Sequence, residues 1–204
     1  TNGTAVGARI ALLIDRAKWP LNRLIRFEWN EILSRRDDIT LKATAALLAR
    51  ELTDPAAALE IYRQVLQEAS ADEEAISAVR RIAEESEDLR LLGAEILEPV
   101  LRAANRHDDL VAVLELQLAA TADAFERGRT LVAIAQVHED GRRDVVAAQA
   151  ALLRAFEETP DNRAVRNDLE RLSTAMAAGE GNSLAGFRAY ADALERKAAD
   201  ASDP

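Results

Sequence analysis

The sequence predicts an all-α protein of about eleven helices stacked as antiparallel pairs, and three observations support this fold class. Apolar residues recur at spacings of three and four along nearly all of the 204 residues, which is the period of an amphipathic helix. Alanine, the strongest helix former, makes up about a fifth of the chain. Residues 41–82 also align with residues 131–172 at an offset of 90, and self-similarity of this kind is typical of stacked repeats.

Capping signals, rather than glycine-rich loops, indicate where the helices begin. Asp54 precedes Pro55, so an N-cap side chain stands before a proline at the first helical position, where the missing N–H costs nothing. Asp72, followed by Glu73 and Glu74, places negative charge where the helix dipole favours it. We expect helices over residues 6–18, 21–36, 39–52, 55–69, 73–85, 88–104, 108–121, 124–140, 144–158, 161–177 and 184–200.

Two proline signals refine the later helices. Thr159 and Pro160 repeat the pattern of an N-cap followed by proline, and Asp161 stands at the start of the next helix. Pro99 lies inside the helix expected over 88–104 and should kink or split it, because proline lacks a backbone N–H and its ring crowds the preceding turn.

The 90-residue repeat aligns helix caps and apolar positions together. Leu41 corresponds to Leu131 and Asp54 corresponds to Asp144, and the apolar positions between them stay in register. We therefore expect one domain over residues 1–204, with basic helices over 1–40, two long repeats over 41–178, and the last helix of a truncated unit over 184–200. On this interpretation the sequence is a piece of a longer array.

These repeats resemble the tetratricopeptide repeat, a helix–turn–helix unit with the pattern W-x₂-L-G-x₂-Y…A-x₃-F…P. In the first copy the matching positions hold Leu41, Thr44, Ala45, Leu48, Ala58, Tyr62 and Ser70. In the second copy they hold Leu131, Ile134, Ala135, His138, Ala148, Leu152 and Pro160. The small residue at the helix contact and the Ala-x₃-large pair are present in both copies. The resemblance, to divergent bacterial members of this family, implies a right-handed α-solenoid with a concave binding face and no catalysis.

Composition and charge exclude several classes of protein. No apolar run approaches the length of a membrane span, and cysteine is absent, which excludes disulfides and cysteine-ligated metals. The net charge is −10, and residues 43–204 carry −13 because residues 1–42 are basic. Nucleic-acid binding depends on clustered Lys and Arg, so this acidic surplus argues against it and favours a basic or neutral protein or peptide partner.

No residue pattern indicates catalysis, a cofactor or a metal site. His107-Asp108-Asp109 is the nearest approach to a metal or acid–base cluster, but neighbours at a helix start point in different directions, and an N-terminal cap explains them better. The other histidine, His138, falls where the repeat calls for a tyrosine, which indicates packing between helices. Paired carboxylates such as Glu73-Glu74 are typical of a solvated helix face.

The leading functional hypothesis is a scaffold that binds a peptide or partner helix in a concave groove. The first helix of each pair lines the concave face of a regular array, so we expect groove residues on 39–52 and 124–140. The candidates for this partner-binding groove are Arg50, Gln136, His138 and Glu139.

The last helix offers a second candidate surface. Leu184, Phe187, Tyr190 and Leu194 share one face, which either packs on the preceding helix or joins two copies as a homodimer. The alternative to a scaffold is a structural spacer or assembly arm of a larger multidomain protein, with no ligand in the groove. Thr1 begins a segment without the features of a signal peptide, and we favour a cytoplasmic location.

Overall fold

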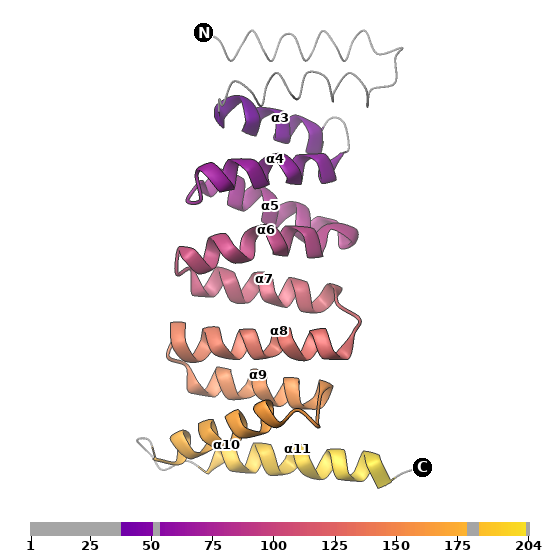
Figure 1. The fold of residues 1–204 in the computed structure, drawn as a ribbon, viewed down its shortest axis with the longest axis vertical. Coiled ribbons are helices and arrows are strands. Elements are labelled where there is room, and N and C mark those ends of the chain that lie inside the picture. Colours follow the sequence, from indigo (N-terminus) through magenta and orange to yellow (C-terminus); the bar gives the residue numbers. More distant parts are fainter. Residues whose placement is uncertain (1–37, 51–53, 179–183, 203–204) are drawn as a thin grey trace. The chain divides into compact units, whose positions relative to one another are not determined.

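A computed structural model describes residues 38–50, 54–178 and 184–202 of the chain, and all secondary structure in these ranges is helical (Figure 1). The contacts between Cα atoms divide the chain into two compact units, with the boundary between Ile82 and Ala83. The helices expected over 6–18 and 21–36 lie outside the described residues. One domain across 1–204 and its right-handed winding therefore stay predictions.

The first unit contains α3 (Asp38–Arg50), α4 (Pro55–Glu68) and most of α5 (Glu73–Glu85). The second unit contains a 3₁₀ turn η1 (Glu87–Leu89), α6 (Arg90–Ala103), α7 (His107–Ala120), α8 (Ala124–Gln136), a π-helical turn η2 (Val137–Gly141), α9 (Val145–Glu158), α10 (Arg163–Ala178) and α11 (Ala185–Ser202). The helix boundaries in the described part agree with the sequence prediction to within a few residues.

Aspartate side chains cap several of the helices, as the sequence indicates. Asp54 accepts a hydrogen bond from the N–H of Ala57 at 3.0 Å, and Asp144 accepts one from Ala147 at 2.9 Å. Asp72 accepts one from Ala75 at 2.9 Å. Each bond satisfies an N–H that the first helical turn leaves without a partner.

The prediction that Thr159 and Pro160 start a helix is wrong. Thr159 is the C-cap of α9: its N–H and its hydroxyl both donate to the carbonyl oxygen of Ala155. Pro160 therefore lies in the turn between α9 and α10, and the cap of α10 is Asn162, which accepts from the N–H of Ala164 at 3.0 Å. A proline directly after a helix fits this turn equally well, because it cannot continue the helix.

Two further helices differ from expectation. Pro99 does not split its helix: α6 is continuous from Arg90–Ala103, and Pro99 and Glu95 are both exposed, so water can solvate the carbonyl that lacks a donor. The helix expected over 124–140 is α-helical only to Gln136 and continues as η2. Beyond η2, Arg143 has φ 57° and reverses the chain into α9.

Segments 90 residues apart have matching backbone structure. The N–H of Asp54 donates to the carbonyl of Leu48 at 3.0 Å, and the N–H of Asp144 donates to that of His138 at 2.9 Å. The ends of the helices correspond as well: α4 (Pro55–Glu68) and α9 (Val145–Glu158) begin 90 residues apart and end 90 residues apart. The α3–α4–α5 and α8–α9–α10 segments thus share the same order of helices and the same backbone hydrogen bond before their second helix.

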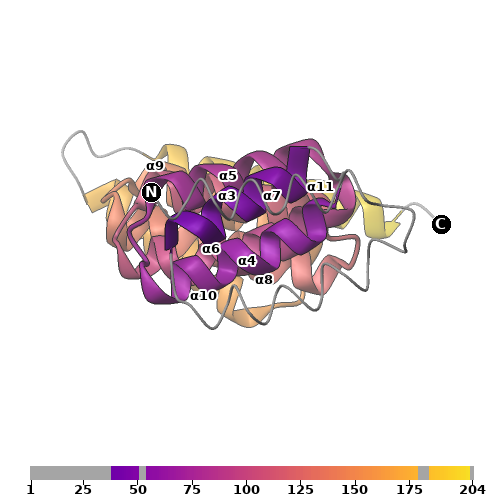
Figure 2. The same ribbon diagram turned by 90° about the horizontal axis from the view of Figure 1, so that it is seen from above.

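Within the second unit, consecutive helices run in alternating directions and pack on one another. Figure 2 shows α7, α9 and α11 in one layer of this unit and α6, α8 and α10 in the other. Its core is made of aliphatic side chains and one phenylalanine, all almost fully buried: Leu97, Leu101, Val113, Leu114, Leu131, Ile134, Leu152, Phe156 and Leu169. Burial of these side chains is the main favourable term that holds the layers together.

Candidate partner-binding surfaces

One side of α8 carries a row of side chains of which three are exposed and one is half-buried. Phe125, Arg129, Val132 and Gln136 follow one another at spacings of four, three and four, so they lie on one face of the helix. Phe125 is 60% exposed although it is a large apolar residue, and Val132 is half-buried. We call these four residues the α8 face. Gln136, predicted as a groove residue, is the last of them.

Glu139 lies beyond the α8 face and is engaged inside the unit. Both of its carboxylate oxygens accept from the guanidinium of Arg171 on α10, and the Nη2–Oε2 distance is 2.8 Å. Arg171 also contacts Asp168 at 3.2 Å. The hydrogen bonds from Arg171 lower the pKa of Glu139, although partial burial opposes this effect. Glu139 therefore links η2 to α10 and offers little of its carboxylate to a partner.

His138 is buried in η2. Its Nδ1 lies 3.3 Å from Nη1 of Arg142, whose Nε contacts Asp108 at 3.1 Å. Burial lowers the pKa of His138, and the positive charge of Arg142 lowers it further, so the ring is neutral at pH 7. The expectation of packing between helices agrees with this position, and a buried neutral imidazole is not a contact surface for a ligand.

The other histidine lies at the same junction, at the start of α7. The ring of His107 packs against Gly141, so closely that a Cβ at Gly141 would come within 2.3 Å of its Nδ1. His107 is the first residue of α7, but the N-cap position is held by Arg106, whose guanidinium pairs with Asp109 at 2.7 Å. The cap role predicted for His107-Asp108-Asp109 is therefore wrong in detail, although both aspartates do lie in the first helical turn.

Arg50, the remaining predicted groove residue, ends α3, and its side chain lies outside the described part. The three groove candidates whose side chains are described have different surroundings, and the groove itself stays a prediction. Gln136 is exposed, His138 is buried and Glu139 is paired. The row on α8 instead contains Phe125, Arg129 and Val132, which were not predicted. The helical spacing of these residues within 124–140 is the signal that could have identified them.

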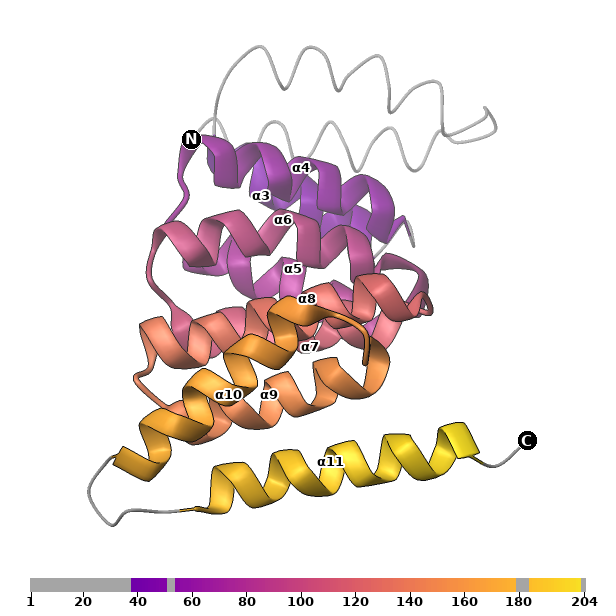
Figure 3. The same cartoon turned by 60° about the horizontal axis from the view of Figure 1, so that its bottom comes forward.

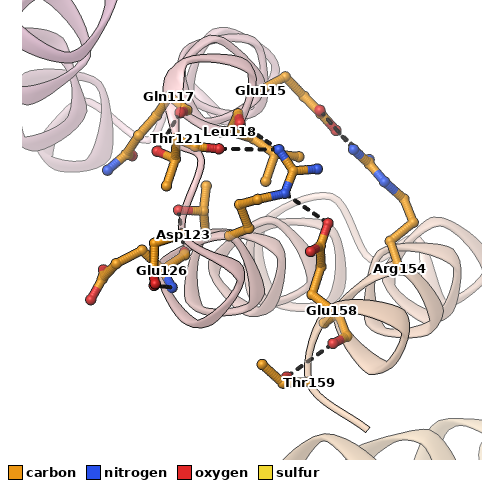
Figure 4. A network of polar contacts seen from close by, with 12 residues as sticks. Glu115, Gln117, Leu118, Thr121, Asp123, Glu126, Arg154, Glu158 and Thr159 are labelled. Carbon is orange, nitrogen blue, oxygen red and sulfur yellow. Dashed lines mark hydrogen bonds and ion pairs between the residues drawn. The ribbon is translucent and has the colours of Figure 1, made fainter.

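A polar network fixes the ends of three helices around α8 (Figure 4). Arg127 donates through Nε to Glu158 at 2.7 Å and through Nη1 to the carbonyl oxygens of Leu118 at 3.0 Å and Thr121 at 3.2 Å. These carbonyls lie at the end of α7, where the helix has no further N–H groups to donate to them. The network holds α8 in place relative to α7 and α9, and thereby positions the α8 face.

Ion pairs also connect the α7, α9 and α11 layer. Arg154 binds Glu115 through two hydrogen bonds of 2.6 and 3.0 Å, and Arg196 binds Glu157 at 3.0 Å. Both pairs join residues 39 apart and link one helix to the next in the layer. Because all four side chains are substantially exposed, each pair contributes little to stability. Together the two pairs neutralise four charges on this surface.

The predicted C-terminal stripe divides into two parts. Tyr190 is only 7% exposed and meets Phe156 of α9 edge-on, with ring centroids 5.8 Å apart. Burial raises the pKa of its hydroxyl. Leu184, Phe187 and Leu194 are instead 53%, 40% and 42% exposed. Tyr190 thus has the packing role that was expected of the stripe, and the homodimer role stays a prediction for Leu184, Phe187 and Leu194.

Metal ligands and membrane spans were also sought in the described part of the chain. No group of three or more His, Asp or Glu side chains there has an arrangement that could hold a metal ion. None of the helices described combines the length and the apolar character that a membrane crossing requires.

Comparison with known proteins gives one coarse structural likeness. No family model and no curated protein matches the sequence. A solved structure described as "MamA RS-1 ArsTM double mutant" is similar over 89% of this chain and 97% of that chain, with 16% identity and a TM-score of 0.44.

Proposed function

We propose that this chain is a non-catalytic protein–protein interaction scaffold that binds a peptide or a partner helix across the α8 face. The observation that carries the proposal is Phe125, a large aromatic residue left 60% exposed beside Val132 and Gln136 on a helix that is otherwise firmly held. Exposed aromatics on a rigid surface are the usual anchors of an interface.

The spacing of this face suits an elongated partner. Phe125 and Val132 are seven residues apart, which is two helical turns, so they match apolar anchors at i and i+7 of a partner helix. The net charge of −10 favours a basic or neutral partner, because attraction speeds the encounter. The proposed location is the cytoplasm, where such a partner would be another soluble protein.

The test is selection of peptides from a display library of amphipathic helices of basic, neutral and acidic net charge. We expect basic or neutral binders, with affinity that falls as salt is raised. Phe125→Ala should weaken the selected peptide about tenfold, which is the effect of losing one anchor of about 1.4 kcal/mol.

Val146→Ala is the matched control. Val146 is 64% exposed and is the second residue of α9, as Phe125 is the second residue of α8, but it lies on a helix of the other layer. This variant should leave the affinity unchanged. Binding that is lost equally in both variants, or acidic peptides as the dominant selection, would contradict the proposal.

A structural spacer is the second candidate, and a specific observation favours it. Two of the four predicted groove residues are engaged inside the unit, His138 by burial and Glu139 by Arg171. A spacer predicts that the library yields no binder whose affinity depends on Phe125.

A further inference from the structure

The helix α11 lies along one edge of the second unit and is covered from one side only. It packs on α9 and α10, and no other described helix of this unit covers its far side (Figure 3). The buried side consists of Gly186, Tyr190 and Ala193. Gly186 allows this close approach, because a Cβ there would come within 2.8 Å of Nε2 of Gln149 on α9.

Next to this buried side, α11 carries an apolar strip. Leu184, Phe187, Ala191 and Leu194 follow at spacings of three, four and three, which is the pattern of a coiled-coil seam, and all four are exposed. We call these residues the α11 strip. Leu184 stands just before the helix, where its carbonyl accepts from the N–H of Arg188 at 3.0 Å. An apolar row of this length is more than scattered surface residues would give.

Two charges on one flank of the strip make it complementary to itself. Arg188 and Glu195 each follow a strip residue directly, Phe187 and Leu194 respectively, and within the described part neither has an ion-pair partner. They are seven residues apart on the same flank, too far to pair with each other along one helix. An antiparallel copy that sets Phe187 against Leu194 of the second copy also sets Arg188 beside its Glu195.

We propose that α11 joins two copies of this chain as an antiparallel homodimer, with the two α11 strips in contact and Arg188 of each copy paired with Glu195 of the other. Twofold symmetry forms this ion pair twice, whereas a parallel arrangement would place the charged flanks of the two copies on opposite sides of the seam, where the pair cannot form. The proposal goes beyond the scaffold function and does not depend on it, because the α8 face lies on a different helix and layer.

The test is a charge swap read by sedimentation equilibrium of the 204-residue chain at low salt. Arg188→Glu and Glu195→Arg, each alone, should weaken dimerisation about tenfold, because two attractive pairs become repulsive. The double variant Arg188→Glu/Glu195→Arg restores both pairs in reversed polarity and should dimerise within about threefold of the original chain. Circular dichroism should show unchanged helix content, since both side chains are exposed.

Phe187→Glu provides a second variant that does not depend on the ion pair and should be monomeric. A chain that stays monomeric to about 0.5 mM would overturn the proposal, as would a dimer that Phe187→Glu leaves intact. A dimer that the double swap fails to restore would also overturn it, because the pairing would then have another register or another surface.

Discussion

Gln149 and Ser173 form a buried polar pair at the point where α9, α10 and α11 meet. Nε2 of Gln149 donates to the hydroxyl of Ser173 at 2.7 Å, and both side chains are buried. At the equivalent positions of the first copy, 90 residues earlier, stand Leu59 and Ala83, which are also buried. At these two positions, one copy of the repeat therefore has polar residues and the other has apolar ones.

This comparison predicts a strongly non-additive pair of substitutions. Ser173→Ala leaves the amide of Gln149 without its partner and should lower the free energy of unfolding by about 1–2 kcal/mol. Gln149→Leu leaves the Ser173 hydroxyl without its partner and should cost about 1 kcal/mol after the gain from the apolar side chain. The double variant reproduces the first copy and should lie within about 0.5 kcal/mol of the original chain, because both polar groups are removed together.

The assay is urea denaturation followed by circular dichroism, with the four chains of the cycle measured side by side. Hydrogen exchange of peptides from α11 should show the same order of stability, because Gly186 of α11 packs on Gln149. The expected coupling energy is about 1–2 kcal/mol. Additive effects, with coupling below about 0.3 kcal/mol, would show that the hydrogen bond does not hold this junction.

Two further predictions concern His138 and the helix caps. Because burial lowers the pKa of His138, the unfolded chain takes up its proton first as the pH falls, so stability should decrease from about pH 6.5 down to the lower pKa of the folded chain. His138→Leu, which copies Leu48 of the first repeat, should remove that decrease in a series of Tm measurements between pH 7.5 and 5; an equal slope in both chains would contradict the assignment. Asp54→Ala and Asp144→Ala each remove one side-chain cap and should each cost about 1 kcal/mol in urea denaturation. A large loss for one and none for the other would show that the two caps are not equivalent.

Local signals were sufficient to predict the helices that the structure describes, but not always which end of a helix a signal marks. Asp54-Pro55 and Thr159-Pro160 look alike in sequence, yet the first pair begins α4 and the second follows α9. The difference lies in the hydroxyl of Thr159, which donates back to Ala155 and completes the preceding helix. Either arrangement satisfies local chemistry, so the sequence alone could not decide between them.

The candidate surfaces depended more on tertiary structure. Glu139 accepts hydrogen bonds from Arg171, which lies 32 residues further along the chain, and Tyr190 packs against Phe156 on another helix. No local sequence pattern could reveal these contacts. Phe125 differs, since its place in the row that ends at Gln136 follows from helical spacing alone. What the sequence could not show is that no described neighbour covers it.

Photo-cross-linking shows directly whether a peptide binds at the α8 face. A photoreactive amino acid would replace Gln136 in one chain and Val146 in another, and each would be irradiated with the tightest basic peptide from the display library. A cross-link should form from position 136 and none should form from position 146. Equal cross-linking from both positions, or a cross-link from 146 alone, would contradict binding at the α8 face.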